Sequence, residues 1–186
     1  MKYFAGFLIA IGLLVLVFIM ILKGFHHSST PKTQQITLSD YASTSTTMQL
    51  TIDGPLTADE KHQGVRINIG QTQNTIQTYQ GYQNTILQTK TYPNNQSAYD
   101  SFLHALQIYG FTKGNKDPNK ADERGYCPGG DRYVYEILSD SNTNIQRWWS
   151  TSCGGQGNFG GTPAQIRSLF IKQIPDYYNI TSKLAI

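Results

Sequence analysis

Hydrophobic and polar residues alternate along several short stretches of the chain, and this pattern predicts β-strands. Met48–Ile52 and Val65–Ile69 alternate residue by residue, and Asn74–Tyr79 and Thr85–Thr89 are two further β-like runs. The connections between the four segments are short, which favours antiparallel pairing of consecutive strands. We therefore expect a four-stranded antiparallel meander in the first half of the folded region.

The apolar residues then change to a helical spacing, which predicts a helix from about Ala98 to Tyr109. Asn94–Ser97 supplies N-cap candidates at its start. Gly110 suits the left-handed residue that follows a helix, with Phe111 folding back as its hydrophobic partner. The next segment, Thr112–Arg124, is highly charged and is expected to be a solvated loop.

The second half repeats this plan with fewer strands. Tyr133–Leu138 and Ile145–Thr151 are predicted to form a hairpin. Thr162–Gln165 has the form of a capping box with proline at the first helical position, before a final helix with a buried stripe over Ile166–Ile174. The predicted order is ββββα-ββα, an α+β fold.

The N-terminal segment has a different character. Phe4–Leu22 contains 19 residues without a charged or strongly polar side chain, which is roughly 28 Å of helix and close to the thickness of a hydrocarbon core. A cleaved signal peptide is the alternative, but its apolar region is shorter and ends at a small-x-small site, which this chain lacks. We therefore predict a transmembrane anchor over residues 1–23, with the lipid bilayer contacted by residues 4–22.

A segment rich in Ser and Thr follows the anchor. Residues 24–47 contain few large apolar side chains, so we expect a flexible tether that precedes a folded domain over residues 48–186. His26 and His27 lie in this segment without a Cys, Asp or Glu neighbour, and we expect no metal site there.

The chain has two cysteines, Cys127 and Cys153. Both fall at the open end of the predicted second hairpin, so a disulfide can form there and close a loop of about 26 residues. Behind a membrane segment this pair favours an oxidising compartment. We expect a single-pass cell-membrane protein whose domain lies outside the cytoplasm, while two reduced cysteines remain the alternative.

Charge argues against nucleic acid as a partner. The net charge is +3, and without Lys2 and Lys23, which flank the apolar run, 13 basic and 12 acidic residues remain. A net charge of +1 provides no basic field for a polyanion.

Gly155–Gly160 matches G-x-G-x-x-G, the dinucleotide-binding pattern. That pattern requires a parallel sheet of βαβ units, whereas hairpins are predicted here, so we expect no dinucleotide and no other cofactor. We interpret the glycines as a sharp turn between strand and helix. A secondary hypothesis places an anion at the helix N-terminus, on Gly160, Gly161 and Thr162.

The chain contains no recognisable catalytic motif. No residue is predicted to be catalytic and none to bind a metal. A cell-envelope hydrolase with an unrecognised site around His104, Asp131 and Glu136 is kept as the rival hypothesis.

Several phrases, among them YPNNQSAYDSFLHALQIYGFT and WWSTSCGGQGNFGG, resemble uncharacterised membrane-anchored proteins of small-genome candidate-phylum bacteria. The resemblance covers most of Met48–Tyr178 and implies an extracytoplasmic location but no activity. The order of strands and helices is also loosely similar to that of small metalloprotease inhibitors of the emfourin type, and a peptidase-inhibitor-like module is a further alternative.

The leading hypothesis is a non-catalytic binding or interaction domain held at the membrane, with an unknown protein or envelope polymer as partner. Neighbouring strand residues point to opposite faces, so one tryptophan of the pair 148–149 is expected in the core and the other on the far face. The aromatic side chains predicted to be most available for contact are Tyr79, Tyr82, Tyr133, Tyr135 and one of Trp148 or Trp149.

Overall fold

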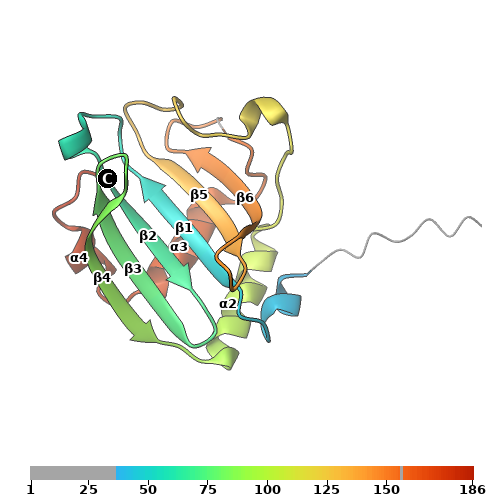
Figure 1. Ribbon diagram of the computed structural model, residues 1–186. Helices are drawn as coiled ribbons and strands as arrows, with labels where there is room; N and C mark the ends of the chain where they lie inside the picture. Colours follow the sequence, from blue (N-terminus) through green and yellow to red (C-terminus); the bar gives the residue numbers. More distant parts are fainter. Residues whose placement is uncertain (1–36, 156) are drawn as a thin grey trace, which may run out of the picture. The chain divides into compact units, whose positions relative to one another are not determined.

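Six antiparallel strands form one sheet in the order β4-β3-β2-β1-β5-β6 in the computed structural model, which describes residues 37–155 and 157–186 (Figure 1). Strands β1 to β4 pair in chain order, which confirms the meander, and β5 returns to pair with β1. The strands are β1 (Thr47–Asp53), β2 (Gln63–Ile69), β3 (Gln73–Gln80), β4 (Thr85–Pro93), β5 (Arg132–Leu138) and β6 (Asn144–Thr151).

The predicted order ββββα-ββα is confirmed, with α2 (Gln96–Ile108) after β4 and α3 (Pro163–Lys172) after β6. A short helix, α4 (Tyr177–Thr181), follows α3 and is an addition to the predicted plan. Three 3-10 turns complete the described elements: η1 (Leu38–Tyr41), η2 (Asp59–Lys61) and η3 (Pro118–Lys120).

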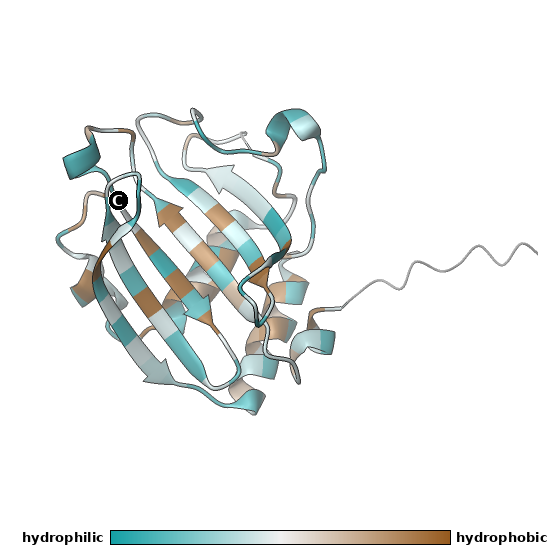
Figure 2. Ribbon diagram, viewed as in Figure 1, coloured by the Kyte–Doolittle hydropathy of each residue, from teal (hydrophilic) through white to brown (hydrophobic). Residues whose placement is uncertain are grey.

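One face of the sheet packs against α2 and α3, which lie behind it in Figure 1. Because strand residues alternate between faces, the apolar residues of β1, β2 and β5 reach this side together, and the bands of hydrophobic and hydrophilic residues along these strands are visible in Figure 2. The sheet and the two helices share a core that includes Leu50, Ile67, Tyr135, Phe102, Leu106 and Phe170.

The ends of α2 follow the sequence prediction. The Asn95 side chain accepts a hydrogen bond from the Ala98 amide at 3.0 Å. Gly110 has a φ of +77°, and the amide of Phe111 donates to Leu106 O at 3.0 Å while the Phe111 side chain is fully buried. The start of α3 differs, because Thr162 makes no side-chain capping bond and the predicted capping box is absent.

The disulfide between Cys127 and Cys153 is confirmed, with 5.7 Å between the two Cα atoms. It joins the long loop before β5 to the segment that leaves β6. The loop, residues 112–131, begins on the helix side, where Gly114 packs against Trp148, and its later part crosses to the opposite face, where the Trp149 indole N–H donates to Lys120 O at 2.7 Å. The two tryptophans do point to opposite faces, but the loop also buries Trp149.

The boundary predicted between tether and domain is wrong by about ten residues. Leu38, within the segment expected to be flexible, is fully buried in the hydrophobic core, and its amide donates to the Gln107 side chain at 3.0 Å. Leu38, together with the partly buried Tyr41 and Ala42, packs η1 and the residue after it against the core. The ordered domain therefore includes residues 37–47.

The predicted transmembrane segment, residues 4–22, lies outside the described residues, as does the tether up to residue 36. Within residues 37–155 and 157–186, no helix has both the length and the apolar character needed to cross a membrane.

Candidate functional site

The face of the sheet opposite α2 and α3 is polar. Gln49, Thr51 and Asp53 alternate along β1 with the core residues, and strand register places them beside the polar residues of the neighbouring strands. Gln49 lies between Asn68 and Glu136, and Thr51 lies between Arg66 and Val134. A polar band therefore crosses the middle of the sheet.

Two hollows lie one after the other along β1 on this face, and we call them together the trough. The larger has a volume of about 300 Å³ and the smaller about 290 Å³. Gln49 lines the larger hollow and its cross-strand partner Asn68 lines the smaller, so this pair lies between the two hollows. The strand residues of the trough used below are Thr47, Gln49, Thr51, Asp53, Arg66 and Asn68.

One end of the trough is built on Asp53, whose carboxylate receives hydrogen bonds from three side chains. His62 Nε2 lies 2.8 Å and the Tyr79 hydroxyl 2.9 Å from Oδ1, and Arg132 Nε lies 3.0 Å from Oδ2. Arg132 is almost fully buried and also donates to the Gly54 carbonyl. A buried guanidinium requires such a partner, so Asp53 holds this corner of the sheet together.

Tyr79 reaches Asp53 across β2. Its ring lies over Gly64, where a Cβ would overlap the ring, so glycine at this position allows the close approach. Burial, and then the neighbouring Asp53 carboxylate, raise the pKa of the Tyr79 hydroxyl well above its usual range. Tyr79 therefore stays protonated at neutral pH and donates to the carboxylate.

Tyr82 forms the rim of the trough at this end. Its ring stacks on His62 with 4.2 Å between ring centroids, and its hydroxyl donates to Thr57 O at 2.8 Å. The ring is nevertheless half-exposed, because its outer side faces solvent. Tyr82 thus offers a flat aromatic surface, fixed in place, beside a polar hollow.

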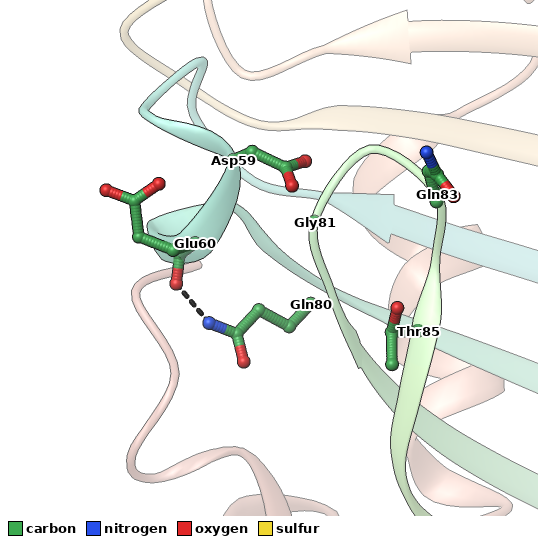
Figure 3. A pocket seen from close by; sticks show the side chains of 6 residues that line it. All are labelled: Asp59, Glu60, Gln80, Gly81, Gln83 and Thr85. Atoms are coloured by element: carbon green, nitrogen blue, oxygen red, sulfur yellow. Dashed lines mark hydrogen bonds between the residues drawn. The ribbon is translucent and has the colours of Figure 1, made fainter.

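A further hollow of about 390 Å³ lies beside the β3–β4 turn (Figure 3). Asp59 points toward this turn, whereas the Glu60 carboxylate points away from it. One Asp59 oxygen already accepts from the Tyr82 amide at 2.7 Å, and Gln80 donates to the Glu60 carbonyl. These contacts position the turn that carries Tyr82.

The opposite wall of the larger hollow contains a second charged cluster. Arg147 donates from Nη2 to both oxygens of Glu123, at 2.7 and 2.6 Å, and its Nε lies 3.4 Å from Glu136. Glu136 also accepts from Gln49. Arg124 pairs with Asp122, with Nε 2.6 Å from Oδ2.

Arg66 differs from the other arginines that line the trough. Its Nε is buried and has no hydrogen-bond partner within the described part of the chain. Its guanidinium carbon lies 5.6 Å from the centre of the Tyr79 ring, and no carboxylate of the described residues lies within ion-pair distance. Arg66 therefore forms no ion pair with the described residues, while Glu123 and Glu136 share the single guanidinium of Arg147, so the charges that line the larger hollow balance.

Of the five aromatic side chains expected to be accessible, the four tyrosines and one tryptophan, only Tyr82 is. Tyr79, Tyr133, Tyr135, Trp148 and Trp149 are all buried, and only Tyr82 is exposed. Alternation placed the two tryptophans on opposite faces, but the helices cover one face and part of the loop 112–131 covers the other, so both are buried.

The predicted anion site at the start of α3 has little donor capacity left. The amide of Gly160 donates to Lys113 O at 2.9 Å, and that of Thr162 donates to Tyr109 O at 3.0 Å. A Cβ on Gly161 would lie 2.7 Å from Tyr109 O. These glycines serve close packing of the chain against the end of α2, and the antiparallel sheet has no βαβ unit for a dinucleotide.

The three residues of the hydrolase hypothesis are not brought together. His104 is exposed on α2, behind the sheet, whereas Glu136 faces the trough. Asp131 accepts from the Tyr133 hydroxyl at 3.2 Å, and burial raises the pKa of its carboxyl group. The sheet separates His104 from Glu136, so this set cannot form one catalytic centre.

Among residues 37–155 and 157–186, no cluster of three or more His, Cys, Asp or Glu side chains is placed to hold a metal ion. Comparison of the chain with protein-family models, with curated proteins and with solved structures found no match.

Sequence reasoning missed the trough, although part of the signal was present. The polar positions of β1 repeat every second residue, as do Arg66 and Asn68 in β2. What the pattern lacked was the strand register, which places Gln49, Asn68 and Glu136 side by side.

Proposed function

We propose that this chain is a membrane-anchored, extracytoplasmic binding domain that holds a linear polar polymer in the trough. The observation that carries the proposal is a sheet face that no described helix covers, hollowed along β1 and lined by hydroxyl, amide and charged side chains. A seven-residue strand such as β1 extends over roughly 20 Å. Several units of a polymer fit along this length.

The position of the trough within the sheet favours a saccharide over a peptide. β1 and β2 are paired on both sides, so their backbone N–H and C=O groups are used within the sheet. Peptides that bind sheets usually pair with an edge strand through these groups. A ligand in the trough is bound by side chains instead, and hydroxyl-rich units complement Gln49, Thr51 and Asn68, while the exposed Tyr82 ring offers a stacking surface.

The location rests on two features. The apolar run over residues 4–22 is long enough to cross a bilayer, and the Cys127–Cys153 disulfide is of the kind that persists in oxidising compartments. A domain tethered to the outer side of a membrane meets envelope polymers directly.

Binding is tested with the full chain in lipid nanodiscs and purified cell-wall polymer, by co-sedimentation. Thr51→Tyr fills the centre of the trough, and Ser101→Tyr places the same ring on the exposed side of α2 as the control. We expect the wild type and S101Y to sediment with the polymer and T51Y to remain in solution, with all three melting at similar temperatures. Equal sedimentation of the three proteins would refute binding in the trough.

Location is tested in intact bacterial cells that express the full chain. We expect external protease to remove the domain and a thiol reagent to label Cys127 and Cys153 only after reduction. Free thiols in a protease-protected domain would show that it lies in the cytoplasm.

A further inference from the structure

We propose that the outer edge of β4 pairs with β4 of a second copy of this chain, so that the sheets of the two copies join into one. The inference goes beyond the proposed function and rests on its membrane anchor. It starts from the two edges of the sheet, β4 and β6, which differ in how far the chain covers them (Figure 1).

The edge of β6 is covered by the chain itself. Gly157 forms a β-bridge with Ser150. The amides of Asn158 and Phe159 both donate to Trp149 O, at 3.1 and 3.0 Å. The Asn158 side chain also accepts from the Trp149 amide at 2.7 Å. Another strand therefore cannot pair with β6 at these positions.

The edge of β4 is open. Among the described residues, none hydrogen-bonds the backbone N–H and C=O groups of β4 that point away from β3. Eight of the nine residues of β4 are exposed. A charge on an edge strand discourages pairing, but the one charged side chain here, Lys90, is compensated by Asp176, with 3.1 Å between Nζ and Oδ2. The row of free donors and acceptors is complementary to another extended strand.

The side chains of β4 favour one register for antiparallel pairing of two copies. Leu87 has no partner in β3, so the regular part of β4 begins at Gln88. With Thr89 opposite Thr89 of the second copy, Gln88 lies opposite Lys90, and two hydroxyl side chains meet at the centre, which is favourable. A register centred on Lys90 would place the two lysines opposite each other, where like charges repel.

This pairing also suits two copies anchored in one bilayer. Antiparallel pairing at an edge relates the copies by a twofold axis perpendicular to the joined sheet. The chain enters the domain through η1, which packs against α2, so both entry points lie on the helix side of the joined sheet. Both troughs lie on the other side, where one polymer can contact the two at once. A dimer that stacked the trough faces together would direct the entry points to opposite sides and close the troughs.

The paired region, Gln88–Tyr92, is a small interface, and small interfaces are weak in dilute solution. The anchor confines the copies to one bilayer, which raises their effective concentration. Dimer formation is therefore measured in liposomes, by energy transfer between full chains that carry donor and acceptor labels. The variants are Thr89→Lys and Thr89→Glu, at an exposed position, and the controls are Ser101→Lys and Ser101→Glu on the exposed side of α2.

We expect energy transfer for the wild type and for both controls. T89K alone and T89E alone should each weaken the dimer about tenfold, because like charges meet at the twofold axis. A mixture of T89K and T89E should recover the transfer, because opposite charges then meet. The recovery distinguishes pairing at Thr89 from an effect of either substitution on folding.

The register is tested by cysteine crosslinking in the same liposomes. Directly opposed residues of antiparallel strands have Cα atoms about 4.5–5.5 Å apart, which a disulfide can span. We expect Thr89→Cys to link two copies under a mild oxidant and Gln88→Cys to link only with Lys90→Cys. Linking of Q88C with itself but not of T89C would overturn the register.

A wild type without energy transfer would overturn the inference and leave the edge to a strand of another protein. Transfer that T89K does not reduce would overturn it as well, because the copies would then meet elsewhere. Neither outcome bears on polymer binding, which the comparison of T51Y with S101Y reports. Failure of the dimer and failure of the proposed function are therefore distinguishable.

Discussion

At the scale of a residue, Arg66 and Arg132 show how a single carboxylate partner changes the environment of an arginine in the sheet. Arg132 is almost fully buried and pairs with Asp53, whereas Arg66 is half-buried and forms no ion pair; each has one buried nitrogen, Nη1 and Nε respectively, without a partner among the described residues. Asp53 compensates the charge of Arg132, whereas the guanidinium of Arg66 lies beside the Tyr79 ring. Both arginines lie on the same face of the sheet, Arg66 in β2 and Arg132 in β5, on either side of β1. Their position in the sheet therefore does not distinguish them.

Asp53→Asn is expected to destabilise the domain by about 3 kcal/mol, because it leaves the Arg132 guanidinium buried without a counter-charge. The free energy of unfolding is measured by urea denaturation. Asp100→Asn, at an exposed position of α2, is the control and should change stability by less than about 0.5 kcal/mol. Similar losses in the two variants would mean that Asp53 contributes no more than a surface charge.

At the scale of elements, the helices and loops that pack over a strand decide how much of it solvent can reach. All seven residues of β5 are buried, because α2 and α3 pack on one face and the loop 112–131 covers much of the other. β4 lies at the edge of the sheet, and most of its residues are exposed. The trough lies between these two extremes, over β1 and β2.

Gly161→Ala is expected to destabilise the contact between the glycine-rich segment and the end of α2 by about 1–3 kcal/mol. The added Cβ would lie 2.7 Å from Tyr109 O, a backbone atom that cannot move alone. Gly129→Ala is the matched control, since a Cβ at Gly129 meets nothing within 4 Å. The melting temperature of both variants is measured, and a G161A protein as stable as G129A would contradict the close packing.

For the whole molecule, the disulfide connects the loop 112–131 to the end of β6 and so keeps Trp149 covered. It closes a loop with a sequence separation of 26 residues, and such a closure restricts the unfolded chain. The hydrophobic core between sheet and helices is independent of this bond and includes Trp148.

Replacing Cys127 and Cys153 with serine is expected to lower the free energy of unfolding by about 3 kcal/mol. Acrylamide quenching of tryptophan fluorescence should increase in part, because Trp149 becomes accessible while Trp148 stays in the core. Urea denaturation and quenching are compared with the oxidised wild type. Unchanged stability and unchanged quenching would show that the loop is held by its other contacts alone.

The sequence by itself determined the order of strands and helices, the caps of α2 and the pairing of the two cysteines, because each depends on residues close together in the chain or, for the cysteines, within one hairpin. Alternation over Met48–Ile52 also put Gln49 and Thr51 on one face, and the structure adds Asp53 at the end of the same strand. Only the tertiary structure decided that the loop 112–131 buries Trp149, that Leu38 joins the core, and that Arg66 lies among carboxylates already paired with other cations. These outcomes depend on strand register and on which segments cover which face, and both are set by contacts between residues distant in the chain.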